Sequence, residues 1–317
     1  MPPILYIVIP CYNEQEVLPE TSKRLKDKMQ QLLADGRIAQ SSRVVFVDDG
    51  SKDNTWNLIV WQTQQDPLFS GIKLSRNRGH QNALLAGYLT VREQADAVIS
   101  MDSDLQDDID AVDGFLEKYE QGCDIVYGVR SSRATDSVFK RITAQGFYKF
   151  MTFLGADIVY NHADYRLMSR RSLDALNQFG EINLFLRGMV TLLGFKTDTV
   201  EYERGERFAG ESKYPLRKML SFAWDGITSF SVKPIKIIVS LGFFIVFLGL
   251  AGLIYSLISY LTGNTVQGWT SMIMSIWVLG GIQLISIGII GEYIGKIYTE
   301  SKRRPRFIIE EYLQTEP

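Results

Sequence analysis

Cysteine and histidine are nearly absent from this chain, and the charges of the two signs almost cancel. The only cysteines, Cys11 and Cys123, each lie beside a strand-like run, which favours reduced core thiols over a disulfide. The only histidines, His80 and His162, supply too few soft ligands for a zinc site. With 34 basic and 36 acidic residues, the chain has no overall field that would attract nucleic acid.

Charged residues are missing altogether from one long segment. No Asp, Glu, Lys or Arg occurs from Ile237 to Gly291, whereas the preceding part has the composition of a soluble α/β protein. This segment is long enough for two membrane spans of about 20 residues each, joined by a hairpin at Thr262–Gly268. Met1–Pro3 leads directly into a strand-like run without a basic start, so no signal peptide is expected.

Basic residues flank the two spans, and the hairpin between them has none. They are Lys213, Arg217, Lys218, Lys233 and Lys236 before the first span, and Lys296, Lys302, Arg303, Arg304 and Arg306 after the second. This distribution predicts a multi-pass protein of the inner (plasma) membrane with its head and both termini in the cytoplasm. Apolar residues at helical spacing in Leu216–Val232 predict a helix in the membrane interface. Glycines in the spans permit close packing within one chain or between chains, so a homo-oligomer is left open.

The chain therefore divides into four predicted segments. They are a soluble head at 1–212, a juxtamembrane amphipathic region at 213–234, a two-helix transmembrane hairpin at 235–298 and a cytoplasmic C-terminal tail at 299–317. Strand-like and helix-like segments alternate through the head from Ile4 to Tyr127. The predicted strands are Ile4–Ile9, Arg43–Val47, Gly71–Leu74, Ala97–Met101 and Asp124–Tyr127, and the predicted helices are Glu14–Leu33, Asn54–Gln65, Gly79–Glu93 and Asp108–Glu120. This alternation predicts an α/β fold with a mostly parallel sheet covered on both faces.

Two carboxylates follow the strand-like run Ala97–Met101. Asp102 and Asp104 are separated by one residue at the carboxyl end of this strand, where open α/β sheets bind their ligands. Two hard oxygen ligands at this spacing can reach one Mg²⁺, with waters and substrate phosphates completing its shell. The alternative is a solvated turn or a helix cap.

Three other predicted strands also end in polar residues. An aromatic ring and an amide in Pro10–Glu14 could contact a base, and the carboxylates of Asp48–Asp53 could accept from uracil or ribose. Ser75–Gln81 offers guanidinium groups and the free N–H groups of a helix start to phosphate. Each stretch alone could be a turn or a cap, but together they favour a nucleotide-diphosphate site.

In the second half of the head, Asn161–Ser169 is predicted to be a polar loop feeding a short apolar run, and it contains an acid and a base two residues apart. Asp164 and Arg166 share a face if their segment is extended, although a surface ion pair is the alternative. Gly128–Arg133 is a basic loop. The glycines and cations of Tyr202–Tyr214 favour a mobile lid over phosphates, with an ordinary linker as the alternative.

In order along the chain, these motifs resemble those of polyisoprenyl-phosphate glycosyltransferases, which include dolichyl-phosphate mannosyltransferases and bacterial undecaprenyl-phosphate (bactoprenol) glucosyltransferases. The resemblance covers nearly the whole chain. One departure is His162-Ala163, where members of the family often have a small residue and glycine. The motifs are Pro10-Cys11-Tyr12-Asn13-Glu14, Val47-Asp48-Asp49-Gly50-Ser51, Leu74-Ser75-Arg76-Asn77, Met101-Asp102-Ser103-Asp104-Leu105-Gln106, Asp164-Tyr165-Arg166-Leu167-Met168 and Gly210-Glu211-Ser212-Lys213-Tyr214.

The resemblance implies a GT-A head, a divalent cation (Mg²⁺ or Mn²⁺) and roles for individual residues. Asp102 and Asp104 are implied to hold the metal, and Asp164, Arg166 and Asp104 to act at the reacting centre. The nucleotide-sugar is implied to bind Pro10, Tyr12, Asn13, Glu14, Asp48, Asp49, Arg76, Asp102, Ser103 and Gln106. The acceptor phosphate and the lid are implied to involve Arg130, Arg207, Ser212 and Lys213.

The expected reaction is inverting, metal-dependent transfer of glucose from UDP-glucose to undecaprenyl phosphate, in the modification of cell-envelope polysaccharide. Two alternatives are weighed against it. A processive polysaccharide synthase shares the Asp-x-Asp head, but this chain has no Gln-x-x-Arg-Trp and only two predicted spans. The other is a non-catalytic membrane scaffold that binds a nucleotide-sugar.

Overall fold

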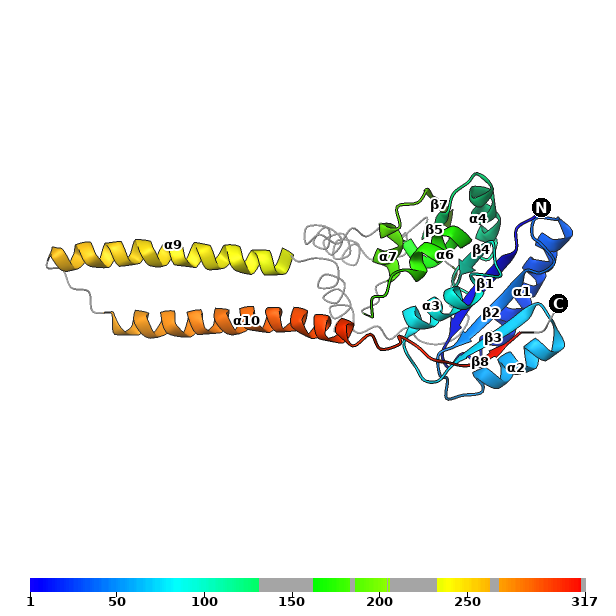
Figure 1. The fold of residues 1–317 in the computed structure, drawn as a ribbon, viewed down its shortest axis with the longest axis horizontal. Helices are drawn as coiled ribbons and strands as arrows, with labels where there is room; N and C mark the ends of the chain where they lie inside the picture. Colours follow the sequence, from blue (N-terminus) through cyan, green and yellow to red (C-terminus); the bar gives the residue numbers. More distant parts are fainter. Residues whose placement is uncertain (131–161, 183–185, 204, 206–232, 263–267, 315–317) are drawn as a thin grey trace. The chain divides into compact units, whose positions relative to one another are not determined.

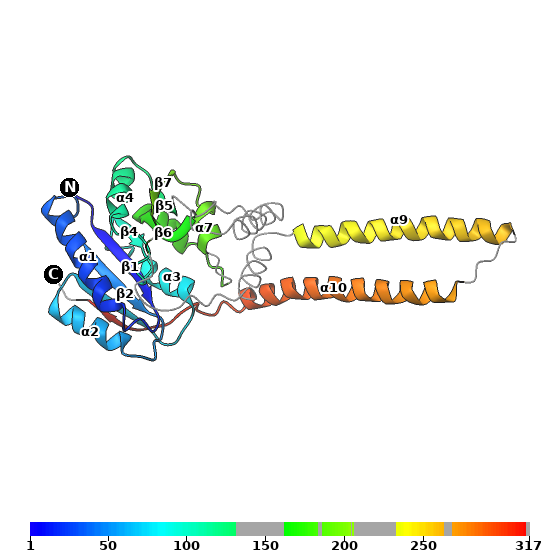
Figure 2. The same cartoon turned by 180° about the vertical axis from the view of Figure 1, so that it is seen from behind.

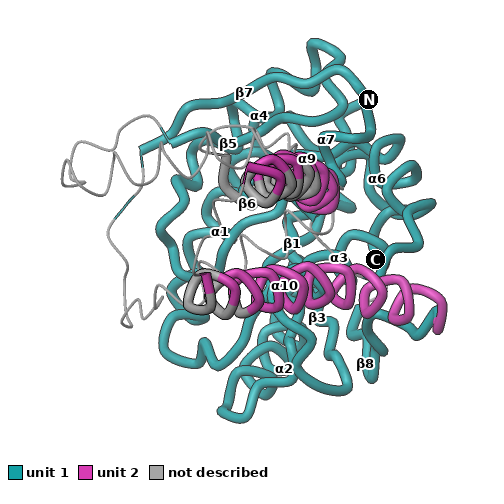
Figure 3. Tube along the Cα trace, turned by 90° about the vertical axis from the view of Figure 1, so that its left-hand side faces the viewer, with its two compact units in different colours: residues 1–148, 157–214, 303–317 teal, residues 149–156, 215–302 magenta. Residues whose placement is uncertain are grey.

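The computed structural model describes residues 1–130, 162–182, 186–203, 205, 233–262 and 268–314. These residues form two compact units (Figure 3). One unit contains the described residues up to 205 together with 303–314, and the other contains those from 233 to 302. The predicted interface helix at 216–232 lies outside the described residues.

A single sheet organises the first unit (Figure 1). Its strands run in the order β7-β5-β6-β4-β1-β2-β3-β8. The pairs β1/β2, β1/β4, β2/β3 and β5/β7 are parallel, while β6 and β8 run antiparallel to their neighbours, so the predicted mostly parallel sheet is confirmed. The strands are β1 Leu5–Cys11, β2 Arg43–Asp48, β3 Phe69–Leu74, β4 Ala97–Ser100, β5 Ile125–Arg130, β6 His162–Ser169, β7 Thr197–Tyr202 and β8 Ile309–Leu313.

Helices cover both faces of this sheet (Figure 2). On one face, Leu25 of α1, Ile59 of α2 and Phe115 of α4 join Ile7 and its neighbours on β1 in one core. On the other face α3 packs against β1 and β2, and α6 contacts α3. Every residue of β1 is consequently buried. The helices are α1 Leu18–Ala34, α2 Thr55–Gln65, α3 His80–Val91, α4 Ala111–Glu120, α6 Arg170–Asn177 and α7 Leu186–Leu192.

β6 was predicted as a polar loop feeding a short apolar run, and that prediction is wrong. His162–Ser169 is a strand held between β4 and β5. The side chains of this strand alternate between the two faces of the sheet. Tyr165 and Leu167 enter the core, while Asp164 and Arg166 share the other face. Because β6 is central in the sheet, it carries Asp164 next to the strand that ends at the Asp-x-Asp loop.

The segment predicted as a C-terminal tail contributes the edge strand β8. It pairs antiparallel with β3, in the register Gly71 to Leu313 and Ile72 to Tyr312. The backbone N–H of Ser75 donates to the Ile308 carbonyl at 3.0 Å, just after β3 ends. β8 therefore covers the β3 edge, whose unpaired N–H and C=O groups would otherwise be open to another chain.

The second unit consists of two long apolar helices, α9 Lys233–Leu261 and α10 Trp269–Ser301, which confirm the predicted hairpin. Within the described residues, Val278–Ser301 is long and apolar enough to cross a bilayer, and α9 contains the shorter apolar stretch Ile235–Ile245. Most large hydrophobic side chains exposed on the described residues belong to these two helices. Such a surface is stable in lipid rather than in water.

Gly87 sets the distance between α3 and the sheet. A Cβ at this position would lie 2.3 Å from Cγ1 of Val8 and 3.0 Å from Cγ2 of Val47. We expect Gly87→Ala to lower the free energy of unfolding by about 1–3 kcal/mol, because the helix must move away from a packed core. Denaturant unfolding followed by tryptophan fluorescence measures this change. The control is Gly180→Ala, whose Cβ has no heavy atom within 4 Å, and an equal loss in both variants would contradict the prediction.

Candidate active site

The Asp-x-Asp loop leaves the carboxyl end of β4 and is anchored by three hydrogen bonds, two to its backbone and one to a side chain. The Thr21 hydroxyl donates to the Ser103 carbonyl at 2.9 Å, and the Tyr165 hydroxyl donates to the Asp108 carbonyl at 2.8 Å. The Tyr202 hydroxyl donates to the Asp107 carboxylate at 2.7 Å. The loop is thereby anchored to α1, β6 and β7, so the two carboxylates sit on a rigid support.

The donor set of this loop fits a hard divalent cation. Asp102 keeps 38% of its side chain exposed. Partial burial, together with the charges of Asp164 and Asp104, raises the pKa of its carboxyl group above the ordinary value, although His80 opposes the shift. Within the described residues no group of three or more His, Cys, Asp or Glu side chains is placed to hold a metal ion by itself. Two crowded carboxylates suit Mg²⁺ or Mn²⁺, which take further oxygens from phosphate and water.

Two guanidinium groups and one imidazole converge on Asp164. Arg166 Nη2 lies 2.7 Å from Oδ1, while Arg187 places Nε 3.1 Å from Oδ1 and Nη2 3.0 Å from Oδ2. His80 Nε2 lies 3.6 Å from Oδ2. Although burial alone would raise it, the pKa of the Asp164 carboxyl is held well below its usual range by His80, Arg187 and Arg166. Asp164 is therefore an ionised anchor.

The predicted site residue Arg166 lies behind this anchor. Its side chain is 0% exposed, and its Nε and Nη1 have no hydrogen-bond partner among the described residues. Such a guanidinium cannot reach a ligand directly. Its charge acts through the Asp164 carboxylate, on which it depends for compensation.

His80 connects the two halves of the site. Its Nε2 lies 3.6 Å from Oδ1 of Asp102 and 3.6 Å from Oδ2 of Asp164, and the interactions with Asp164 and Asp102 raise its pKa despite the opposing effect of burial. His80 is the first residue of α3, directly after Gly79 with φ +87°. The Asp-x-Asp loop and Asp164 thus meet on one imidazole.

Asp49 holds the loop that leads into α3. Its carboxylate accepts the backbone N–H groups of Arg78 at 2.7 Å and Gly79 at 2.8 Å. The neighbouring Gly50 has φ +68°, and a Cβ there would lie 2.6 Å from the Asn77 nitrogen. Burial raises the pKa of the Asp49 carboxyl group, and the two N–H groups partly oppose this. Asp49 therefore positions the loop with both of its oxygens.

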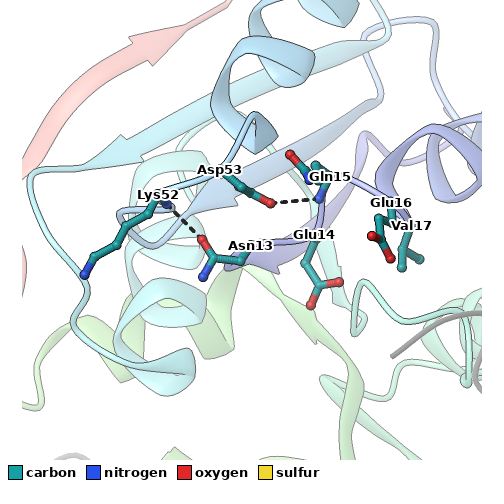
Figure 4. Close-up of a pocket in the computed structure, with 7 residues that line it drawn as sticks. All are labelled: Asn13, Glu14, Gln15, Glu16, Val17, Lys52 and Asp53. Atoms are coloured by element: carbon teal, nitrogen blue, oxygen red, sulfur yellow. Dashed lines mark hydrogen bonds between the residues drawn. The ribbon is translucent and has the colours of Figure 1, made fainter. Parts of the chain in front are cut away.

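The remaining predicted donor residues gather where β1 and β2 end. Asp48 is fully buried and accepts the Ser51 N–H at 3.2 Å. Asn13, at φ +57°, accepts the Lys52 N–H at 2.8 Å, and the Asp53 carboxylate accepts from Gln15 (Figure 4). A pocket of about 460 Å³ opens here. It is lined by Asn13, Glu14, Gln15, Glu16, Val17, Lys52 and Asp53.

Other predicted site residues are less closely grouped. Pro10 lies within β1, and Tyr12 is 41% exposed just after that strand. Arg76 is exposed, whereas Ser103 is buried, and the Gln106 N–H donates to Asp104 Oδ1 at 3.2 Å. Arg130 ends β5 opposite Tyr202. Arg207, Ser212 and Lys213 lie outside the described residues.

The contacts of two site residues, His80 and Arg187, were not predicted from the sequence. His80 was noted only as a poor zinc ligand and as part of the Ser75–Gln81 run, and Arg187 was not singled out. Arg187 does carry a signal, because it is the only charged residue from Leu184 to Phe195. A single charge in an apolar run indicates a buried partner.

The head has a mostly parallel α/β sheet with an Asp-x-Asp loop at its strand ends. The same chain carries an apolar helical hairpin. This combination is that of a membrane-anchored glycosyltransferase. Residues 6–176 match the model of glycosyl transferase family 2, and residues 233–297 match that of the GtrB C-terminal hairpin. The chain belongs to glycosyl transferase family 2.

Similarity to individual proteins extends through the head and the hairpin. The "Uncharacterized glycosyltransferase YkoT" of Bacillus subtilis (strain 168) is 54% identical over 308 residues, which are 97% of this chain and 91% of that protein. The bactoprenol glucosyl transferase of Shigella phage SfV is 40% identical over 306 residues, or 96% of this chain and 97% of that protein. A prophage bactoprenol glucosyl transferase homolog of Escherichia coli (strain K12) is 39% identical over 306 residues, with coverage of 96% and 97%. These matches confirm the resemblance and the GT-A expectation.

Arg166 makes stability depend on Asp164. We expect Asp164→Asn to lower the free energy of unfolding by about 3–5 kcal/mol, because it leaves a buried guanidinium charge uncompensated. Urea unfolding of the detergent-solubilised protein measures the change. Asp174→Asn is the control, since Asp174 is 57% exposed and 3.9 Å from Arg92, and such pairs contribute about 1 kcal/mol or less. A loss below about 1 kcal/mol for Asp164→Asn would contradict the assigned pairing.

Proposed function

We propose that this protein transfers glucose from UDP-glucose to undecaprenyl phosphate, with inversion at the anomeric carbon. An acceptor phosphate oxygen attacks C1 of the sugar, and the bond from C1 to the β-phosphate oxygen breaks. The products are a lipid-phosphate-linked glucose and UDP. The proposal includes a head and both chain termini on the cytoplasmic side of the inner membrane.

One observation carries this proposal. Proteins whose names state bactoprenol glucosyl transfer match this chain over 96% of its length, through both the catalytic head and the hairpin. The physical division of the chain supports it further. A polyprenyl phosphate has a charged head at the bilayer surface and a tail in the hydrocarbon, so an enzyme acting on it needs a polar site and a membrane anchor in one chain.

The residues of the site divide the work of this reaction. The pocket beside Asn13 is proposed to hold the base and ribose of the donor, while the fully buried Asp48 supports the Ser51 backbone next to it. Asp102 and Asp104 are proposed to hold the divalent cation, which would supply Lewis-acid neutralisation of the charge that develops on the departing UDP. Arg130 is proposed to attract the acceptor phosphate, together with Arg207, Ser212 and Lys213.

No strong general base is needed in this reaction. The second ionisation of a phosphate monoester lies near pH 6, so the acceptor is largely a dianion at neutral pH. Asp164, with its pKa held low, is a poor proton acceptor. Its negative charge instead orients His80 and Arg187 around the reacting centre, and the pre-organised charges stabilise the transition state.

Removal of one metal-binding carboxylate provides the first test. We expect Asp102→Asn and Asp104→Asn each to lower the rate of sugar transfer by at least 100-fold, with membrane insertion intact, because one oxygen ligand loses its charge. Excess chelator should abolish transfer by the unaltered protein, and added Mg²⁺ or Mn²⁺ should restore it. Asp108→Asn is a control in the same loop, since Asp108 is exposed and, within the described residues, its side chain accepts the backbone N–H of Asp110 at 3.0 Å. Full activity of Asp102→Asn in chelator would overturn the metal assignment.

A donor panel tests the substrate assignment. Purified protein, Mg²⁺ and undecaprenyl phosphate are incubated with UDP-glucose, UDP-galactose, UDP-N-acetylglucosamine and GDP-mannose, and the lipid products are separated by mass. We expect one hexose per lipid, from UDP-glucose. A lipid-linked polymer would indicate the processive synthase, and binding of UDP-glucose without transfer would indicate the scaffold. Transfer from another donor would contradict glucose as the transferred sugar but would still support sugar transfer to the lipid phosphate.

A further inference from the structure

The orientation of the Asp164 carboxylate depends on more than its buried partner. Among the described residues, the Arg166 side chain makes one hydrogen bond, from Nη2 to Oδ1 of Asp164. A single contact to one oxygen leaves the carboxylate free to rotate about that bond. Arg187 contacts both oxygens, through Nε to Oδ1 at 3.1 Å and Nη2 to Oδ2 at 3.0 Å. A two-point fork of this kind fixes the plane of a carboxylate as well as its charge.

Arg187 is itself held in place by the helix that carries it. Leu186, Met189 and Val190 of α7 are fully buried, so one side of the helix is embedded in the protein. The Gln81 side chain accepts the backbone N–H of Leu186 at 2.9 Å, which ties the start of α7 to the start of α3. The residue before Gln81 is His80, which contacts Asp164 and Asp102. The first turns of two helices thus meet at the same carboxylate.

We propose that Arg187 is a positioning residue for sugar transfer, whose guanidinium fork fixes the Asp164 carboxylate in the orientation that aligns His80 with the Asp-x-Asp loop. This inference rests on the proposed function, because it assigns Arg187 to the same reaction. Arg187 acts through Asp164, and no contact between Arg187 and the donor is required. Misplacement of a reacting group by about 1 Å can cost roughly 100-fold in rate.

Two substitutions separate the fork from the charge. Arg187→Gln removes both, and Arg187→Lys keeps the charge on a flexible stem that cannot make the same two-point contact. We expect kcat to fall roughly 10- to 100-fold in Arg187→Gln and to a smaller extent in Arg187→Lys. The KM for UDP-glucose should stay within about 3-fold in both, because the donor-binding pocket is untouched.

The matched control is Arg171→Gln. Arg171 also forms an ion pair with an aspartate, Asp124 at 2.8 Å, but it lies on α6 and is 67% exposed. We expect this variant to keep the kcat and KM of the unaltered protein. Thermal unfolding of each variant, with and without UDP-glucose, shows whether the head is folded and still binds the donor. A folded Arg187→Gln that keeps its donor-induced stabilisation and loses kcat supports the positioning role.

Three results would overturn this inference. They are an unchanged kcat in Arg187→Gln, an Arg187→Lys protein as fast as the unaltered one, and a loss confined to the KM for UDP-glucose. An Arg187→Gln protein that no longer unfolds cooperatively would also overturn it, since the residue would then be structural. Absence of transfer by the unaltered protein and by Arg171→Gln would instead contradict the proposed function, so the two failures are distinguishable.

Discussion

A buried positive charge is the constraint on which this site depends. Arg166 is fully buried, and the Asp164 carboxylate two residues away is its ionic partner among the described residues. Desolvating a guanidinium is costly unless an anion lies in contact with it, so the carboxylate must stay ionised and in place. Arg187 and His80 then approach the same anion from the solvent side. The result is a fixed negative charge among cations, next to the loop proposed to hold a metal.

The sheet brings these groups together from distant parts of the sequence. Asp102 follows β4, and Asp164 lies near the start of β6, the antiparallel neighbour of β4 in the register Ser100 to Arg166. His80 comes from the start of α3, on a loop whose N–H groups are bound by Asp49. Each side chain is set by backbone in a strand end or a helix start rather than by a free loop. Rigid support of this kind gives a charged site its precision.

Much of the fold follows from local sequence. β1 to β5 and α1 to α4 were predicted within a few residues, because each is an apolar run or an amphipathic stretch bounded by turn residues. β6 was missed because Asp164 and Arg166 interrupt its apolar pattern, and their burial is possible only when each neutralises the other. β8 was missed because Ile309–Leu313 is short and acidic, and only pairing with β3 makes it a strand. Both strands are stabilised by partners that local patterns do not reveal.

The site shows the same division between local and tertiary information. Asp102, Asp104 and Asp164 could be chosen as candidates from spacing and strand ends. The contacts of His80 and Arg187 to Asp164 could not be foreseen, because they span 84 and 23 residues of sequence and a single histidine or arginine has no periodicity. The contacts of Asp49 also differ from those expected. A carboxylate at a strand end was expected to bind ribose or base, yet both of its oxygens accept N–H groups of the loop before α3.

The charges of the site also bear on how two anionic substrates could be brought together. The proposed donor and acceptor are both anions, and two anions approach each other only where positive charge is already fixed. In this structure Arg166 and Arg187 are both held by the Asp164 carboxylate. In the proposed reaction, this cluster would keep positive charge fixed beside the Asp-x-Asp loop. Asp164 would then serve transfer by placing charge, and not by taking a proton.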